Sequence, residues 1–150
     1  MLRRVIYTLL LITWMIIIFL FSNQGSLNSI RLSDKLTQKT INTVNKVTGK
    51  EVKDESKTVI NNRFIIRKAA HFTLYFILGV LVYQTLSSYG VKKYILVYSV
   101  LFCLVYASSD EIHQLFNDRT FRKLDIFIDT LGGLTGSTLI HFFTKRLTNH

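Results

Sequence analysis

Residues 110–136 read DEIHQLFNDRTFRKLDIFIDTLGGLTG, and this stretch lies between two strongly apolar segments. Its second half carries an acid or a glycine at successive steps of 4, 3 and 4, which is one face of a helix: Asp125, Asp129, Gly132 and Gly136. Glycines on such a face let helix backbones approach closely in a membrane. Acids on the same face are costly beside lipid, so they indicate a polar interior. The stretch therefore predicts a membrane helix packed against other helices.

The composition and the clustering of apolar residues favour a membrane protein over a soluble domain. The chain has 150 residues, enough for one domain, with 49% hydrophobic residues and a mean hydropathy of +0.29. Four apolar runs are long enough, allowing for tilt, to cross a hydrocarbon core of about 30 Å. They cover residues 5–21, 69–86, 94–109 and 124–143. We predict an all-α, polytopic membrane protein, a four-transmembrane-helix bundle that forms a single domain over residues 1–150.

The first apolar run is followed by a long polar segment. The first run is expected to stay as an anchor, because no small-x-small cleavage site follows it. Residues 22–66 form a long polar segment with a thin amphipathic stripe of Leu36, Thr40, Val44 and Val47. Such a stripe would lie along a membrane surface, or belong to a solvated linker helix.

The net charge of +10 points to lipid rather than to nucleic acid. The basic residues lie in loops that flank the apolar runs, where they contact anionic headgroups, and not on one soluble face. We therefore expect membrane lipids as partners and no nucleic acid. The single cysteine, Cys103, lies in the third run and has no intrachain disulfide partner.

Four crossings gather the polar residues at one side of the membrane. The end of the first span, the start of the second, the end of the third and the start of the fourth share that side. The residues found there are Gln24, Lys68, His71, Tyr75, Asp110, Glu111, His113, Gln114, Arg119, Asp125 and Asp129. The other side holds the short turn with Lys92 and Lys93 and the two basic termini, and basic short loops favour the cytoplasm. We expect a multi-pass protein with both termini in the cytoplasm.

Ionisable side chains within or beside a span indicate function, because a charge there is costly. The candidate catalytic residues are those able to exchange protons: His71, Asp110, Glu111, Asp125 and Asp129. The candidate ligand-binding residues are Gln24, Lys68, Tyr75, His113, Gln114 and Arg119. At the end of the third helix, Asp110, His113 and Gln114 share one face and Glu111 points elsewhere.

The carboxylates and imidazoles of these candidate residues are compatible with more than one function. Carboxylates and imidazoles could hold a divalent metal, or supply a general acid and base. The alternative is a buried network that fixes the register of the helices without chemistry. Two familiar motifs are excluded. Residues 110–113 match a helicase DExH string, but the chain has no phosphate-binding loop, which a helicase needs. The chain also has no H-E-x-x-H motif, which excludes the common metalloprotease arrangement.

Three blocks of the sequence resemble the VanZ-like family of small bacterial membrane proteins. They are Phe21-Ser22-Asn23-Gln24, then Arg67–Phe72 with Tyr75 and Gly79, then Asp110–Phe116 with Arg119, Asp125, Asp129, Gly132 and Gly136. In this order they cover all four spans. Asn117-Asp118 precedes Arg119 where the family often has Pro-Gly, so this turn is expected to differ in shape.

The resemblance implies a role in the cell envelope and a place in the bacterial cytoplasmic membrane. Through the family's name-giving member it also implies low-level resistance to teicoplanin, a lipid-tailed glycopeptide. One hypothesis is that the outward polar site binds or modifies an anionic lipid or a lipid-linked cell-wall precursor, with Arg119 and Lys68 on its phosphate. The other is a non-enzymatic component that limits lipoglycopeptide access. A small oligomeric transporter is disfavoured, because the charges lie at one end of the spans.

Overall fold

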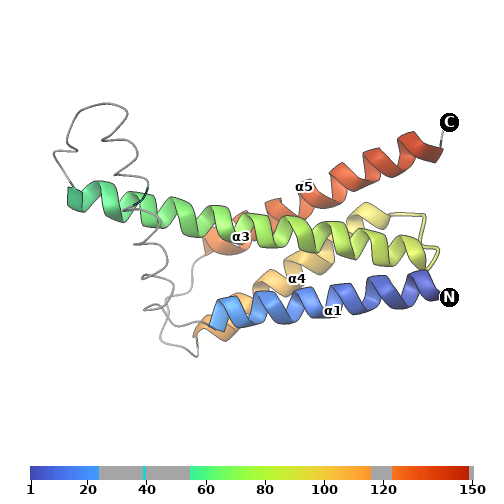
Figure 1. Cartoon of the computed structure of the whole chain (residues 1–150), viewed down its shortest axis with the longest axis horizontal. Helices are drawn as coiled ribbons and strands as arrows, with labels where there is room; N and C mark the ends of the chain where they lie inside the picture. The colour runs from blue at the N-terminus through green and yellow to red at the C-terminus, as the bar shows by residue number, and fades with distance from the viewer. Residues whose placement is uncertain (24–38, 40–54, 116–122, 149–150) are drawn as a thin grey trace. The chain divides into compact units, whose positions relative to one another are not determined.

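The computed structural model describes residues 1–23, 39, 55–115 and 123–148, and the regular elements in this part of the chain are α-helices. They are α1 (Leu2–Asn23), α3 (Glu55–Ser88), α4 (Ile95–Leu115) and α5 (Lys123–Thr148), shown in Figure 1. Each contains a stretch long and apolar enough to span a membrane: Leu2–Ser22, Lys68–Ser88, Ile95–His113 and Leu124–Arg146. The prediction of an all-α protein with four spans is confirmed.

The chain divides into two compact units, which are described separately. One unit comprises Met1–Asn23 and His71–His150, and the other comprises Gln24–Ala70 with the beginning of α3. The amphipathic stripe predicted within residues 22–66 lies outside the described residues. The four-helix arrangement below concerns the first unit.

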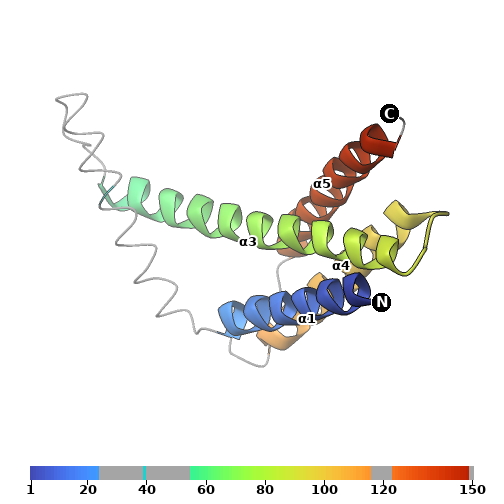
Figure 2. The same cartoon turned by 45° about the vertical axis from the view of Figure 1, so that its right-hand side comes forward.

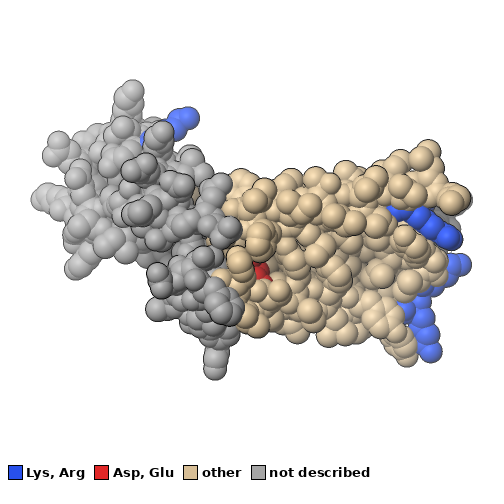
Figure 3. Space-filling view, turned by 90° about the horizontal axis from the view of Figure 1, so that it is seen from below, with Lys and Arg blue, Asp and Glu red and all other residues tan. Residues whose placement is uncertain are grey.

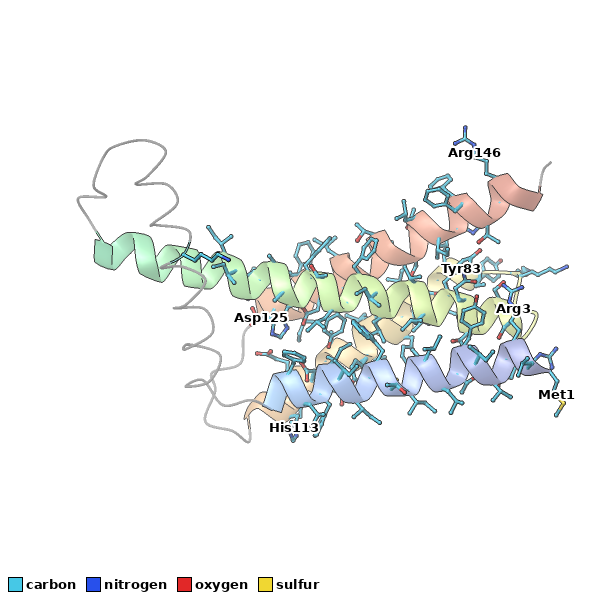
Figure 4. The ribbon with its side chains drawn as sticks, viewed as in Figure 1. Met1, Arg3, Tyr83, His113, Asp125 and Arg146 are labelled. Carbon is cyan, nitrogen blue, oxygen red and sulfur yellow. The ribbon has the colours of Figure 1, made fainter. Side chains whose placement is uncertain are left out.

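Successive helices of this unit alternate in direction, as Figures 1 and 2 show. The start of α1, the turn between α3 and α4, and the end of α5 therefore lie together. Met1, Arg3, Tyr83 and Arg146 mark this end in Figure 4, and we call it the terminal end. His113 and Asp125 mark the opposite end, which we call the polar end. The alternation that the sequence predicted is confirmed.

Side-chain hydrogen bonds to backbone carbonyls connect α1 to its neighbours. The Trp14 indole donates to the Leu74 carbonyl of α3 at 2.9 Å, and the Tyr106 hydroxyl of α4 donates to the Met15 carbonyl at 2.7 Å. In a membrane, hydrogen bonds between helices contribute about 0.6 kcal/mol each on average. Each bond forms only when the two helices that it joins are at one position along each other, so it also fixes their register.

Glycines bring α5 into backbone contact with α3. A Cβ atom at Gly132 would lie 2.5 Å from the carbonyl oxygen of Phe72. A Cβ atom at Gly136 would overlap the carbonyl oxygen of Phe76. Both collisions involve backbone atoms, so only glycine fits at these positions with the helices as they are. The packing role predicted for these two glycines is confirmed.

A second pair of glycines, which the sequence did not single out for packing, completes this contact. A Cβ atom at Gly79 of α3 would overlap the carbonyl oxygen of Gly133, and one at Gly133 would lie 2.6 Å from the Cβ of Cys103 in α4. The Ser137 hydroxyl, which is fully buried, lies 3.1 Å from the Gly79 carbonyl oxygen and 2.8 Å from that of Gly133. Helix α5 is therefore held against both α3 and α4.

The apolar core is small and centres on α3 and α4. Its buried members are Ile18, Tyr75, Leu78, Val82, Cys103 and Ala107. Large apolar side chains remain exposed on the outer faces of α1 and α4, among them Leu9, Ile16, Val97, Leu101 and Val105. This distribution suits a bundle whose outer surface contacts acyl chains, since lipid does not penalise exposed leucine or valine.

Removing the Tyr106 hydroxyl tests the contact between α1 and α4. Tyr106→Phe keeps the ring and removes the hydrogen bond from α4 to the Met15 carbonyl, so we expect a loss of about 0.6 kcal/mol of stability, the average for such bonds. The measurement is the thermal melting temperature of the purified protein in detergent. Tyr98→Phe, at a half-exposed position of α4, should leave that temperature unchanged. Equal effects of both substitutions would contradict the contact.

Candidate functional site

Four carboxylates are buried at the polar end. The exposed fractions are 6% for Asp110, 4% for Glu111, 5% for Asp125 and 3% for Asp129. Among the described residues, acidic atoms are visible in Figure 3 as one small red area. A buried carboxylate is costly unless other groups compensate its charge or it takes up a proton. Four of them at one end of a bundle therefore make this end the candidate site.

Helix geometry places these acids in two pairs. Asp125 and Asp129 lie one turn apart on α5, and Asp125 is in the first turn, where the helix dipole favours an acid. Asp110 and Glu111 are consecutive in α4, about 100° apart around the helix, and yet both are buried. The sequence expected Glu111 to point away from the face of Asp110, so different neighbours must surround the two side chains.

His71 of α3 lies beside Asp129 of α5. The His71 Nδ1 atom is 3.5 Å from the Asp129 Oδ2 atom, which is an ion-pair distance rather than a short hydrogen bond. The His71 side chain keeps 18% of its exposure, whereas Asp129 is almost fully buried. The sequence expected His71 among the partners of Asp129, and the structure brings the two together.

Tyr75, one turn after His71, is buried near acids of α4 and α5. Its side chain is completely buried, and both Asp110 and Asp129 act electrostatically on its hydroxyl group. Within the described part of the chain, neither this hydroxyl nor the Asp129 Oδ1 atom has a hydrogen-bond partner. Buried polar atoms of this kind are rare in folded proteins. Tyr75 is therefore the point where three helices bring polar groups together.

Tyr106 packs at this point and was not among the site residues predicted from the sequence. Its ring centroid is 6.2 Å from that of Tyr75, and Asp110 acts electrostatically on its hydroxyl group as well. A signal was present, because Tyr106 lies four residues before Asp110 and so shares its helix face.

His113 occupies the edge of the site next to α1. Its ring centroid is 4.7 Å from that of Phe19. Among the residues that the structure describes, no hydrogen-bond partner reaches its Nε2 atom. Ser22, at the end of α1, is also buried.

Four of the predicted site residues are not placed in this group. Gln24 and Arg119 lie outside the described residues, and Gln114 belongs to α4 but its side chain is not described. Lys68 belongs to the other compact unit. Their roles remain predictions.

The described side chains do not form a metal cage of their own. In residues 1–23, 39, 55–115 and 123–148, no group of three or more His, Cys, Asp or Glu side chains is arranged to hold a metal ion. What the arrangement does offer is an imidazole beside a buried carboxylate, with a second carboxylate and a phenol close by. These are groups that can hold and transfer a proton.

A family model described as VanZ/LLP1 matches residues 7–144, which include all the residues of the polar end that the structure describes. No curated protein and no solved structure matches the chain.

Proposed function

Because this chain belongs to the VanZ/LLP1 family, we propose that it is a cell-envelope protein whose polar end binds an anionic lipid or a lipid-linked cell-wall intermediate. The His71–Asp129 pair exchanges a proton with the bound headgroup and so supports its modification. Low-level resistance to teicoplanin-type lipoglycopeptides is the phenotype that follows. The observation that carries the proposal is the contact of 3.5 Å between His71 and the buried Asp129, next to Tyr75.

The chemistry of the pair supports proton exchange. A carboxylate beside Nδ1 of an imidazole favours the tautomer with its proton on that nitrogen, which leaves Nε2 to take a proton from a ligand. His71 is partly exposed and Asp129 is not, so a headgroup reaches the ring first while the acid stays shielded from solvent.

The distribution of basic residues supports an outward-facing polar end. Lys and Arg side chains gather at the terminal end in Figure 3, and short basic loops favour the cytoplasm. In this proposal the termini are cytoplasmic and the polar end faces the outside. Lys68 and Arg119 are proposed to contact the phosphate of the ligand, because basic side chains form strong charge-assisted bonds with phosphate oxygens.

One observation favours a second candidate function. Asp110, Glu111 and Asp125 each make further interactions within the protein. Buried ionic networks of this kind can fix the register of helices without any chemistry. The alternative is therefore a non-enzymatic membrane component that limits antibiotic access, with the polar cluster as a purely structural element.

Two conservative substitutions test the proposed function. His71→Gln and Asp129→Asn keep the size and hydrogen-bonding capacity of each side chain but remove its ability to exchange a proton. General acid–base catalysis contributes about 10²–10⁴-fold, so we expect either variant to lose the resistance phenotype. The measurement is the minimum inhibitory concentration of teicoplanin in cells that express each variant, with its abundance in the membrane followed by immunoblot.

His141→Gln is the matched control. His141 lies in α5 towards the terminal end, where its Nδ1 atom is 3.0 Å from the Tyr83 hydroxyl, and its substitution should preserve the phenotype. If both His71→Gln and Asp129→Asn keep full resistance at normal abundance, the acid–base proposal is wrong and the structural alternative is supported. A wild-type protein that leaves the inhibitory concentration unchanged would refute the resistance phenotype.

A further inference from the structure

We propose that the terminal end is a binding site for an anionic phospholipid, whose phosphate is held by the Arg4 guanidinium. The acyl chains of this lipid lie along α1. The site is at the opposite end of the bundle from the His71–Asp129 pair, so it does not depend on the function proposed for that pair. With the polar end facing outward, the bound lipid belongs to the cytoplasmic leaflet.

Arg4 of α1 is held against the end of α3. Its Nε atom donates to the Ser88 carbonyl at 3.0 Å. This carbonyl is among the last four of α3, which lack a partner within the helix. In the turn that follows, the Gly90 amide bonds to the Ser87 carbonyl, and Gly90 has a φ of 88°. Arg4 therefore completes a helix C-terminus of the glycine type and has a fixed position there.

An aromatic ring holds the same guanidinium. The Cζ atom of Arg4 lies 5.6 Å from the centroid of the Tyr89 ring, which is within cation–π range. The Tyr89 hydroxyl is 3.3 Å from the Thr8 hydroxyl, which itself donates to the Arg4 carbonyl at 2.9 Å. Arginine has five N–H donors, and the bond to Ser88 uses the one at Nε. In the described part of the chain the two Nη groups make no further bond, so they are left for a ligand.

A guanidinium that is fixed in this way suits a phosphate group. Its planar fork matches two phosphate oxygens with parallel charge-assisted hydrogen bonds, which a lysine ammonium cannot do. Because the Ser88 carbonyl and the Tyr89 ring already hold the side chain, binding costs less conformational entropy than at a freely moving arginine.

The charges around Arg4 also favour an anion. The basic residues of the terminal end are Arg3, Arg4, Lys92, Lys93, Lys145 and Arg146, and Figure 3 shows Lys and Arg side chains gathered there. All nine acidic residues of the chain lie between positions 34 and 129, and none of them lies in residues 1–33, 56–109 or 130–150. These ranges include the start of α1, the turn after α3 and the end of α5. The potential at this end therefore attracts a negative group.

The surface beside Arg4 selects a phospholipid over a free anion. An apolar stripe of half-exposed side chains starts at the next residue of α1 and continues at steps of 4, 3 and 4: Val5, Leu9, Ile12 and Ile16. Acyl chains can lie along this stripe while the headgroup is at the guanidinium, whereas inorganic phosphate would contact only the guanidinium. Basic sites between membrane helices on the cytoplasmic side are known to bind anionic headgroups.

Two arginine-to-lysine substitutions distinguish a shaped site from general attraction by charge. Arg4→Lys and Arg146→Lys both keep the net charge, but Arg4 is the one held by the Ser88 carbonyl and the Tyr89 ring. The full chain in non-ionic detergent is titrated with phosphatidylglycerol, and the rise in melting temperature gives the affinity. We expect Arg4→Lys to weaken the affinity about tenfold, as for the loss of one hydrogen bond to a charged group. Arg146→Lys should leave it unchanged.

A second pair of variants tests the ring beneath the guanidinium. Tyr89→Leu removes the cation–π contact, so we expect the affinity for phosphatidylglycerol to fall about two- to fivefold. Tyr98→Leu removes a half-exposed ring from α4 and should not change the affinity. If Arg4→Lys does not fold, this pair decides. Wild-type affinity in both Arg4→Lys and Tyr89→Leu, or equal weakening in Arg4→Lys and Arg146→Lys, overturns the proposal.

Three further measurements identify the ligand and the end of the bundle at which it binds. Zwitterionic phosphatidylcholine should raise the melting temperature less than phosphatidylglycerol, and an equal rise contradicts a site for anionic lipid. Inorganic phosphate that reproduces the full rise assigns the site to a free anion and rejects the lipid. An affinity that falls in His71→Gln but not in Arg4→Lys places the lipid at the polar end, which refutes the terminal site and supports the proposed function. The reverse result supports the terminal site alone.

Discussion

Adding a single methyl group at Gly136 is expected to disrupt the contact between α3 and α5. In Gly136→Ala the new Cβ would overlap the carbonyl oxygen of Phe76, a backbone atom that cannot rotate away as a side chain can. The collision is avoided only if the two helices move apart, and this movement would also lengthen the hydrogen bond from the Ser137 hydroxyl to the Gly79 carbonyl. Overpacking of a core costs about 1–3 kcal/mol, and we expect the upper part of that range here. The melting temperature in detergent measures the loss.

Thr135→Leu is the control for added bulk on the same helix. Thr135 precedes Gly136 but is exposed, so a larger apolar side chain there should meet lipid or detergent and leave the melting temperature unchanged. A wild-type melting temperature in Gly136→Ala would show that α3 and α5 are not packed together at this point. Destabilisation in both variants would point to a general intolerance of α5 to substitution.

The four spans could be predicted because apolar runs of this length, in a chain of this size, are typical of membrane helices. The apolar run of the third span was predicted to end at Ser109, but the sequence also placed Asp110, His113 and Gln114 on one face of the end of the third helix. Helix α4 does continue to Leu115. Backbone hydrogen bonding does not depend on whether a side chain suits lipid, so a helix can extend beyond the membrane. Asp110, Glu111 and His113 are thus fixed to a rigid element and not to a loop.

The site was predictable only in part. The number of crossings placed His71 and Asp129 at the same end, but periodicity identifies one face of one helix and not the helix that packs against it. For this reason the meeting of Gly79 with Gly133 and the position of Tyr106 beside Tyr75 emerged only from the structure. Tyr75 was expected to bind a ligand from its place near His71. That it is buried near acids of two helices depends on how the helices pack across the bundle.

Truncating His71 is expected to destabilise the bundle, independently of any effect on activity. In His71→Ala the buried Asp129 carboxylate loses the imidazole 3.5 Å away. Leaving a buried polar group without its partner costs about 1–3 kcal/mol, and breaking a fully buried ion pair costs about 3–5 kcal/mol. We expect the lower range, because the side chain of His71 is 18% exposed and water can replace part of the interaction. The measurement is again the melting temperature in detergent.

A double-mutant cycle with Asp129→Ala isolates the interaction between the two residues. Once the carboxylate is absent, losing the imidazole should cost less, and coupled neighbours show interaction energies of about 0.5–3 kcal/mol. His141→Ala combined with Asp129→Ala is the matched control, and its effects should add because His141 lies far along α5. Additive effects for His71 and Asp129 would mean that the imidazole does not interact with the carboxylate. A strong coupling in stability, together with full resistance in Asp129→Asn, would assign the pair to the architecture of the bundle, because a structural contact tolerates the loss of a proton that catalysis requires.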